Sequence, residues 1–312
     1  MAMNKKAVFF TAMSLILLML VFYSLNIRTS YSLRDKSYVI GERIKSVDFF
    51  IDDLEKDIQR GVYISMFRSV LGIQQYITST GEFLNDTQET FKEILLNGTI
   101  DGSYISVMNQ TELNVWIGKI QSEAGTVGIT FNYTINDVRL YQKNPWVIAV
   151  DLNVTMHIID MKNTASWSRD QVITSELNIT TFEDPLYIKY TYGRIISTIK
   201  QTNITDFTTG TNTDNLLYHI DNSLYRNSTS APSYIMRLSG NLSNSSFGIE
   251  SIVNLKAFED AALTIKDKSC IDYIYFSNNT PQAWFINETY NWLKLDNESN
   301  HLGMYEVEHL II

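Results

Sequence analysis

An uninterrupted apolar run near the start of the chain is its strongest sequence pattern. Residues 7–27 (AVFFTAMSLILLMLVFYSLNI) contain no charged side chain. At about 1.5 Å of rise per residue, a helix of this length spans roughly 30 Å, which matches the hydrocarbon core of a bilayer. We therefore predict a transmembrane helix over residues 7–27, with the lipid bilayer as its partner.

A cleaved secretory signal is the alternative for this run. The apolar core of such a signal is usually about 7–15 residues long and is followed by small residues at the cleavage site. This run is longer, and Phe22-Tyr23-Ser24 offers no such site. Basic charge at Lys5 and Lys6 favours leaving residues 1–6 in the cytoplasm. We expect an anchor in the cell membrane, with the N-terminus cytoplasmic and the bulk of the chain extracellular.

Beyond the anchor, apolar residues recur at steps of three and four, as on one face of a helix. They are Ile40, Ile44, Val47, Ile51, Leu54 and Ile58. Most positions between them are charged or polar, so the pattern predicts a stalk helix with one buried face. Either the protein's own sheet or another copy must cover that face. We favour the sheet, because its apolar strand faces also need a cover.

Two shorter amphipathic helices are predicted next, over residues 86–97 and 112–124. Gly98 ends the first helix. Thr111 caps the second, and Gly125 ends it.

After the second of these helices the hydrophobic period changes to two, which is typical of half-buried strands. Pro145 and residues 163–168 predict turns between the strands. The predicted strands cover residues 127–135, 146–158 and 173–179. Together they predict an antiparallel meander with one face packed on helices.

The remaining part of the chain has a less regular pattern. Residues 182–186 (FEDPL) predict a sharp turn or linker into a second unit, and the polar residues 203–215 predict an exposed loop. Further on, the pattern indicates short strands at 234–238 and 270–277, a helix at 250–257, and a final strand pair at 292–295 and 305–311.

The predicted fold class is α+β. An N-terminal transmembrane helix continues into a long amphipathic helix, an antiparallel β-meander packs on helices, and a second mixed α/β unit follows. The predicted divisions are a tail (1–6), the transmembrane helix (7–27), the stalk and helices (28–125), the sheet that forms one domain with those helices (126–185), and the C-terminal unit (186–312).

Charge and cysteine content argue against a nucleic-acid-binding protein and against one stabilised by internal disulfides. The net charge is −9 with no block of lysine or arginine, so phosphate would be repelled and we expect no nucleic-acid partner. The single cysteine, Cys270, cannot form an internal disulfide. It is either a buried thiol or part of an intermolecular bridge.

Glycosylation acceptors of the form Asn-x-Ser/Thr are unusually frequent. Random placement would give roughly five. The chain has thirteen, at Asn85, Asn97, Asn109, Asn132, Asn153, Asn178, Asn203, Asn227, Asn241, Asn244, Asn278, Asn287 and Asn297. None lies before or within the apolar run, which agrees with an extracellular location for the rest of the chain. The acceptors in predicted strands fall on the polar side, where a glycan would face solvent.

Patterns for catalysis or metal binding are weak. No metalloprotease, nucleophile-elbow, P-loop or Cys-x-x-Cys motif occurs. Three groups can be drawn as sites, but an alternating strand, a polar turn and a capped turn explain them more simply. They are a metal set (His301, Glu306, Glu308, His309), a calcium-like set (Asp296, Glu298, Asn300) and a carboxylate pair (Glu183, Asp184). We expect no catalytic residue, metal or cofactor, and hence a protein that is not an enzyme.

The order of elements resembles the type IV pilin architecture over about residues 4–181. Lys5-Lys6-Ala7 is similar to an archaeal prepilin-peptidase site, which implies processing between Lys6 and Ala7. Many pilins carry a glutamate five residues into the mature chain, whereas residues 7–27 contain none. The segments FEDPLY, RLSGNLSNSSFGIESIVNL and YNWLKLDNE resemble uncharacterised archaeal cell-surface proteins with a pilin-like start.

These patterns predict a single-pass, N-glycosylated surface protein with a structural or adhesive role. The resemblance adds a pilin-like role, with other envelope or pilus proteins as partners. One alternative is a ligand-binding or sensor ectodomain, which would need a membrane partner because residues 1–6 cannot hold a signalling domain. A surface enzyme is the other alternative, but no set of nucleophile, base and orienting group supports it.

Overall fold

The structure, a computed structural model, describes residues 5–161 and 165–312, with side chains described at 9–26 and from 38 onward within those ranges. Residues 1–4 of the predicted tail, and Asn163 and Thr164 of a predicted turn, lie outside it. The α+β class is confirmed, as are the apolar N-terminal helix and the antiparallel pairing of the strands.

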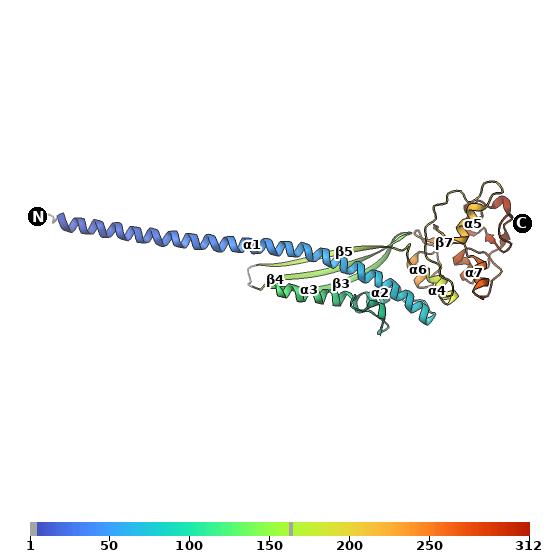
Figure 1. Ribbon diagram of the computed structural model, residues 1–312, viewed down its shortest axis with the longest axis horizontal. Coiled ribbons are helices and arrows are strands. Elements are labelled where there is room, and N and C mark those ends of the chain that lie inside the picture. Colours follow the sequence, from blue (N-terminus) through green and yellow to red (C-terminus); the bar gives the residue numbers. More distant parts are fainter. Residues whose placement is uncertain (1–4, 162–164) are drawn as a thin grey trace.

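The helix α1 (Lys5–Thr80) is continuous over 76 residues and is therefore roughly 110 Å long. Its first half projects away from the rest of the chain, and its second half lies along the sheet (Figure 1). Within it, the stretch Phe9–Asn26 is apolar and long enough to cross a membrane, and none of that stretch is buried. A signal sequence would pass the same test of length and composition.

The first short helix has the predicted ends and the second does not. In α2 (Thr87–Asn97) the Asp86 carboxylate accepts a hydrogen bond from the Glu89 N–H at 3.0 Å, and Gly98 is left-handed with φ 71°. The prediction that Thr111 caps the next helix is wrong, because its hydroxyl donates to the Met108 carbonyl at 2.6 Å. The elements that follow α2 are β1 (Thr99–Ile100), β2 (Ser103–Tyr104), η1 (Ser106–Met108) and α3 (Leu113–Thr126). The helix α3 therefore ends one residue after Gly125, where its end was predicted.

Three long strands form an antiparallel sheet in the order β3-β4-β5, with bounds β3 (Ile129–Asn144), β4 (Val147–Asp160) and β5 (Ser166–Asn178). The strand β3 is longer than predicted because its register shifts between Ile135 and Asp137, which moves the buried positions from odd to even residues. Val127 lies in the exposed cap of α3 rather than in a strand. Ser166 already belongs to β5, so the turn predicted at 163–168 is shorter.

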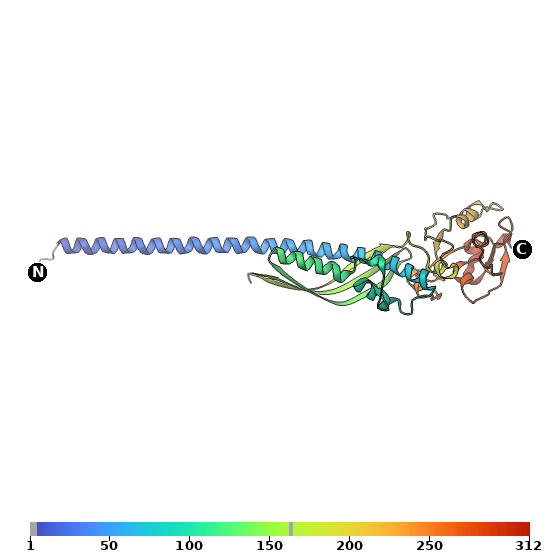
Figure 2. The same cartoon turned by 60° about the horizontal axis from the view of Figure 1, so that its bottom comes forward.

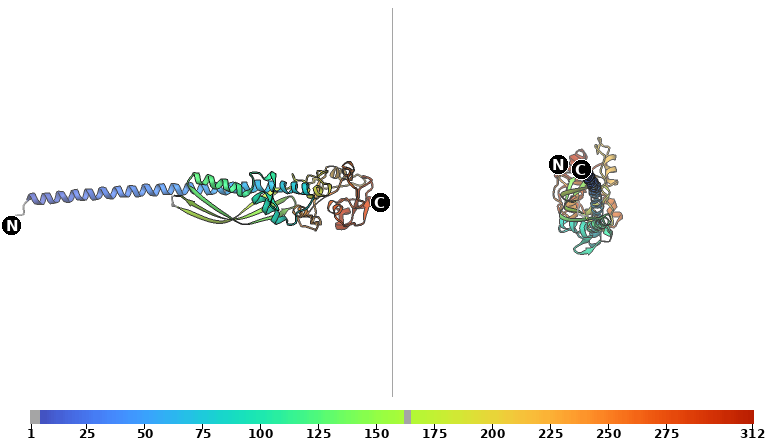
Figure 3. Two further views of the ribbon diagram at one scale, coloured as in Figure 1. Left: turned by 90° about the horizontal axis from the view of Figure 1, so that it is seen from below. Right: turned by 90° about the vertical axis from the view of Figure 1, so that its left-hand side faces the viewer.

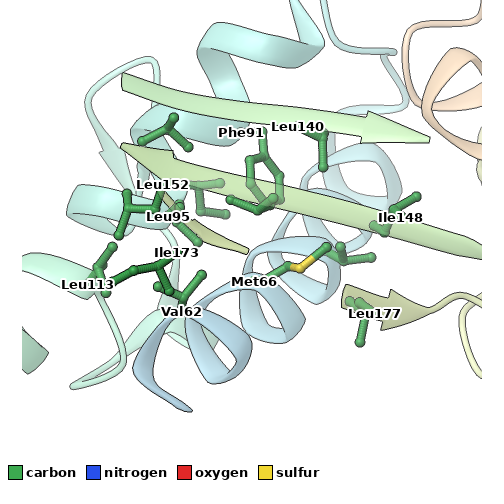
Figure 4. Packing of buried hydrophobic residues seen from close by; sticks show 14 of the residues in the cluster. Val62, Met66, Phe91, Leu95, Leu113, Leu140, Ile148, Leu152, Ile173 and Leu177 are labelled. Carbon is green, nitrogen blue, oxygen red and sulfur yellow. The ribbon is translucent and has the colours of Figure 1, made fainter. Parts of the chain in front are cut away.

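The helices α1, α2 and α3 cover one face of this sheet, and its other face is open (Figures 2 and 3). In the core between them, Met66 of α1, Phe91 of α2 and Ile148 of β4 belong to one cluster of buried side chains (Figure 4). The apolar positions predicted on one face of α1, from Ile40 to Ile58, are here called the α1 seam. The seam is buried from Val47 onward, as predicted for cover by the protein's own sheet.

The seam prediction is wrong at its start, where Ile40 is 43% exposed and Ile44 is only partly buried. The reason is the length of the sheet. Arg43 donates to the carboxylate of Asp160 at the end of β4, with an Nη2–Oδ1 distance of 2.8 Å, so the sheet ends level with Arg43. Ile40 lies almost one helical turn beyond that point.

The C-terminal part of the chain consists of short elements at the end of the molecule farthest from the N-terminus (Figure 1). The strands β6 and β7 pair antiparallel, as do β8 and β9. In order, the elements are α4 (Pro185–Thr191), α5 (Asp214–Asp221), β6 (Tyr225–Asn227), α6 (Tyr234–Leu238), β7 (Ile249–Ser251), α7 (Leu255–Asp260), α8 (Asp272–Phe276), β8 (Ala283–Phe285), β9 (Lys294–Asp296), η2 (Glu298–Asn300), α9 (His301–Met304) and η3 (Glu308–Leu310).

Several predictions for this part are wrong. The strands predicted at 234–238 and 270–277 are the helices α6 and α8, because a short buried apolar run has no period that separates strand from helix. The helix predicted at 250–257 starts only at Leu255, after β7. The strand β9 pairs with β8 instead of with residues 305–311, which form a turn and η3 and then an isolated antiparallel bridge between Ile311 and Ile286.

Two hydrophobic cores are present among the described residues. The first fills the space between α1 and the sheet and takes in Tyr225, Tyr234 and Ile249 from the C-terminal part. The second lies wholly beyond residue 185 and includes Leu186 and Leu255. The division of the chain at residue 185 stays a prediction.

Candidate partner face and glycosylation sites

A stripe of exposed side chains runs along the side of α1 that faces away from the sheet. Its members recur at spacings that place them on one side of a helix: Tyr38, Phe49, Asp53, Lys56, Arg60 and Tyr63, here called the outer α1 face. Phe49 is 71% exposed and Tyr63 is 46% exposed. A single exposed aromatic residue is ordinary, but aromatic residues aligned with a hollow suggest a contact surface.

Such a hollow lies beside the outer α1 face, between α1 and α3. It has a volume of about 510 Å³, and its apolar floor is formed by Phe50, Leu54, Trp116 and Ile120. Charges of both signs line its rim, from Asp53, Lys56, Asp57, Arg60, Lys119 and Glu123. An apolar floor with a charged rim suits an amphipathic helix.

The position of Trp116 in this groove depends on Gly61 of α1, which leaves room for the indole ring. A Cβ built on Gly61 would lie 2.7 Å from Trp116 Cδ1, so only glycine lets the ring lie against α1. The indole Nε1 is buried without a hydrogen-bond partner among the described residues. Such an unsatisfied donor is costly, and it lies against α1, 2.8 Å from the position that a Gly61 Cβ would take.

On its other side, α1 borders the edge strand β5 through two shallower hollows of about 350 and 470 Å³. The ion pair between Arg169 and Glu55, at 2.7 Å, ties β5 to α1. Gln59 donates to the carbonyl of Thr174 at 3.4 Å. The polar edge of β5 is thus partly covered by α1 side chains, which protects it from pairing with another strand.

The glycosylation acceptors lie outside α1 and α3. All thirteen acceptor asparagines are exposed, and none of the Ser or Thr residues two positions later is buried. No acceptor falls within α1 or α3 over the described residues. Exposure alone is weak support, since most of the other described asparagines are exposed too. The informative feature is that α1 and α3 have no acceptor, although Asn109 precedes Gln110, whose carbonyl accepts from Lys119 at the rim of the hollow.

Three acceptors lie on the open sheet face, as the alternation predicted. Asn132, Asn153 and Asn178 are all exposed there. At Asn178 the Oδ1 accepts the backbone N–H of Thr180 at 2.8 Å. That bond leaves Nδ2, the atom that carries a glycan, out of the turn.

The carboxylate pair at residues 183 and 184 has a structural position that the sequence did not indicate. Asp184 is buried, whereas a solvated turn was predicted. Its carboxylate caps α4 by accepting the Leu186 N–H at 2.9 Å, and it pairs with Arg237 at 2.5 Å. Arg237 also pairs with Asp272 at 2.8 Å. Burial raises the pKa of Asp272 to about 6, while Arg237 opposes that rise.

The metal set drawn from the sequence is dispersed. His301 is buried and contacts Asp296 at 2.8 Å and Glu250 at 3.7 Å, the latter too long for a hydrogen bond. Burial alone would lower the pKa of His301, but the two carboxylates outweigh it and raise the pKa to about 9. Glu306 instead accepts the backbone N–H groups of Phe207 and Thr208, at 2.7 and 3.1 Å.

The other metal candidates also have local partners. His309 contacts the carbonyl of Gly210 at 2.7 Å, and Glu308 is exposed in η3, so the alternating strand predicted for this segment is wrong. Of the calcium-like set, Glu298 accepts from Asn279 at 2.9 Å, and Asn300 is left-handed with φ 64°. The described residues contain no cluster of three or more metal-ligating side chains.

Cys270 is buried, as one of the two alternatives for it predicted. Burial raises the pKa of its thiol to about 12, so the reactive thiolate is scarce at neutral pH. The chain therefore offers no exposed native thiol within the part that the structure describes.

Sequence reasoning missed the hollow between α1 and α3 and the buried ion pairs of Arg237 with Asp184 and Asp272. The groove could have been found from Phe49, an aromatic residue on the polar side of the stalk, together with Gly61, which interrupts a helix of good helix formers. Arg237 carried no such signal, because its partners lie far away in sequence.

No family model matches the chain, and no match was found among curated proteins or solved structures. The pilin resemblance thus stays a prediction that rests on the order of the elements and the short N-terminal motif.

Proposed function

We propose that the chain is a single-pass, N-glycosylated surface protein that is held in the cell membrane by the first part of α1. Its role is structural or adhesive, in a pilin-like arrangement in which the outer α1 face contacts another copy. Most of the chain then lies outside the cell, and residues 1–6 lie in the cytoplasm.

The observation that carries this proposal is the unburied stretch Phe9–Asn26 at the free end of a continuous helix. Its large apolar side chains have no cover within the protein. Moving one such side chain from water to an apolar phase contributes about 1.5–3 kcal/mol, so exposure of the whole stretch to water would be strongly unfavourable. A bilayer supplies that cover, and the continuity of α1 supports a retained anchor.

The distribution of acceptors supports the choice of partner face. Glycans are bulky and hydrated, so a surface that carries them is poorly suited to close contact with protein. The open sheet face has three acceptors, whereas α1 and α3 have none. We infer that the sheet faces solvent and that the outer α1 face and its groove contact a neighbour.

Membrane anchoring and orientation are tested on intact cells. Protease added outside should cleave within residues 203–215, where most side chains are exposed, and the protein should stay in the membrane after carbonate extraction. Intact mass will show whether the N-terminus begins at Met1 or Ala7. Release of the protein by carbonate, or protection of residues 203–215, would contradict the proposal.

Contact through the outer α1 face is tested by cysteine cross-linking in native membranes. Because Cys270 is buried, one introduced cysteine gives an unambiguous product. Phe49→Cys and Tyr63→Cys should form disulfide-linked or short bis-maleimide-linked dimers, whereas Val172→Cys, which is exposed on the open sheet face, should not. Equal cross-linking at Val172, or none at either α1 position, would exclude this face.

A further inference from the structure

A small hollow of about 250 Å³ opens between the end of α4, the segment that joins α7 to α8, and the end of α8. Its floor is aromatic. The ring of Tyr190 stacks on that of Phe276, with centroids 4.9 Å apart and planes 7° apart, and the buried rings of Phe258 and Tyr275 complete it. The polar residues around the opening are Tyr192, Arg194, Thr264 and Lys266.

Both charged residues that line this hollow are cations, in a chain whose net charge is −9. The Nζ of Lys266 lies 5.8 Å from the centroids of Tyr190 and Tyr275. Arg194 donates to the carbonyl of Ala261 at 3.4 Å, which holds it across the opening. Among the described residues that line the hollow there is no carboxylate to neutralise these charges, so the hollow favours an anion.

Tyr192 stands in an unfavourable backbone conformation. It ends α4 with φ 55° and ψ 39°, a left-handed position that usually takes glycine or asparagine. Gly193, which follows directly, is also left-handed, with φ 67°. Tyr192 is 70% exposed, and the Arg194 guanidinium lies over its ring, with Cζ 6.0 Å from the centroid. Retained strain of this kind is concentrated at ligand-binding sites.

We propose that this hollow binds an acidic sugar, a hexuronate unit of a polysaccharide or glycan. This inference rests on the adhesive role proposed above and names its ligand. The faces of Tyr190 and Tyr192 offer flat apolar surface to the C–H face of a pyranose ring. Arg194 and Lys266 pair with the sugar carboxylate.

The size and position of the hollow fit such a ligand. It is smaller than the roughly 300–1,000 Å³ clefts that hold drug-sized molecules, so it takes one or two sugar rings and no extended peptide. The C-terminal part of the chain lies at the end of the molecule opposite the N-terminus (Figure 3). With α1 in the membrane, the hollow is held far from the anchor, where polymers outside the cell would meet it.

The test is calorimetric titration of the full-length chain in detergent micelles with trigalacturonate. The matched ligand is its methyl ester, which keeps the sugar rings and removes the charge. We expect trigalacturonate to bind at low salt, to bind more weakly as salt rises, and to bind at least tenfold better than the ester. Absence of binding by the folded protein both with and without its own glycans, or equal binding of the ester, would overturn the proposal.

Variants then locate the binding site. Arg194→Met and Lys266→Met should each weaken binding about tenfold or more, while Lys256→Met, an exposed lysine outside the hollow, should not. Tyr192→Asn removes the aromatic ring and should also weaken binding, because asparagine tolerates the left-handed conformation and the backbone should not change. Tyr218→Asn, at another exposed tyrosine, is the matched control and should leave binding unchanged. Binding unchanged in all three hollow variants would refute the assignment.

Two sources of hexuronate are separated by repeating the titration on protein made without glycans. Binding that is equal in both preparations indicates an external polysaccharide. Binding that appears only without glycans indicates that glycans of neighbouring copies fill the hollow. Absence in both refutes the site. None of these outcomes affects the anchoring and cross-linking tests, which involve other residues.

Discussion

Two neighbouring α1 side chains should respond in opposite ways to the same substitution. Ile51 is 1% exposed and lies in the core with the sheet, whereas Phe49 is 71% exposed on the outer α1 face. Two residues along a helix are about 200° apart around its axis, so these side chains point to opposite sides. We expect Ile51→Asp to disrupt folding and Phe49→Asp to disrupt only contact with a neighbour.

The expected magnitude follows from burial. Removing a buried isoleucine costs about 2–5 kcal/mol through lost burial and the cavity left behind. An unpaired carboxylate at the same place adds several kcal/mol. The sum reaches the lower part of the range of about 5–15 kcal/mol for the stability of a folded domain. Ile51→Asp should therefore unfold the sheet and its helices, whereas Phe49→Asp should change stability by about 0.5 kcal/mol or less.

The assay is thermal circular dichroism with limited proteolysis on the full-length chain in detergent micelles. Ile51→Leu is the volume-conserving control and should cost less than about 1.5 kcal/mol. Phe49→Asp should keep the wild-type melting curve while abolishing cross-linking through Tyr63→Cys. If Ile51→Asp stays folded and loses only its contacts with other copies, the α1 seam is an intermolecular contact and the packing argument is refuted.

Three further predictions concern single residues. Calorimetry should show that Gly61→Ala is destabilising, because its Cβ would meet the Trp116 ring at 2.7 Å, whereas Gly118→Ala, with nothing within 4 Å, should gain about 1 kcal/mol. The pKa of His301 is raised to about 9, so its stabilising effect is complete below pH 6.5 and is lost as pH rises through 9; the melting temperature should fall across that window in the wild type, and His301→Gln should lose this dependence. Glycopeptide mass spectrometry should find Asn178 occupied, and unmodified peptide at all three strand acceptors would remove the glycoprotein proposal.

The sequence predicted the first half of the fold well because its elements are long and periodic. The helix α2 has a side-chain cap at Asp86 and a left-handed glycine at Gly98, which are local signals that tertiary contacts did not override. The strand β4 is buried on alternate residues over most of its length and shows its period clearly. The bulge in β3 was missed because one inserted residue reverses the alternation without leaving a mark in composition.

The C-terminal part was less predictable for a physical reason. Its helices α6 and α8 have five residues each, so neither shows a full helical period. Their conformation is set by distant partners, as where Arg237 of α6 pairs with Asp272 of α8 and with Asp184. These three charged side chains come from three separate segments and meet inside the protein, where each needs a partner. The sequence of any one segment does not predict that contact.

The composition of α1 changes with the surroundings that each part of the helix meets, and this links the fold to the proposed function. Over Phe9–Asn26 it is apolar on every side, which suits lipid and no aqueous environment. From Val47 onward it has one apolar side, and the sheet covers that side. Between these parts, Ile40 and Tyr38 remain exposed on opposite sides of α1, because the sheet does not extend that far along the helix. That segment, with the outer α1 face that continues from it, is where we expect neighbouring copies to supply the missing cover.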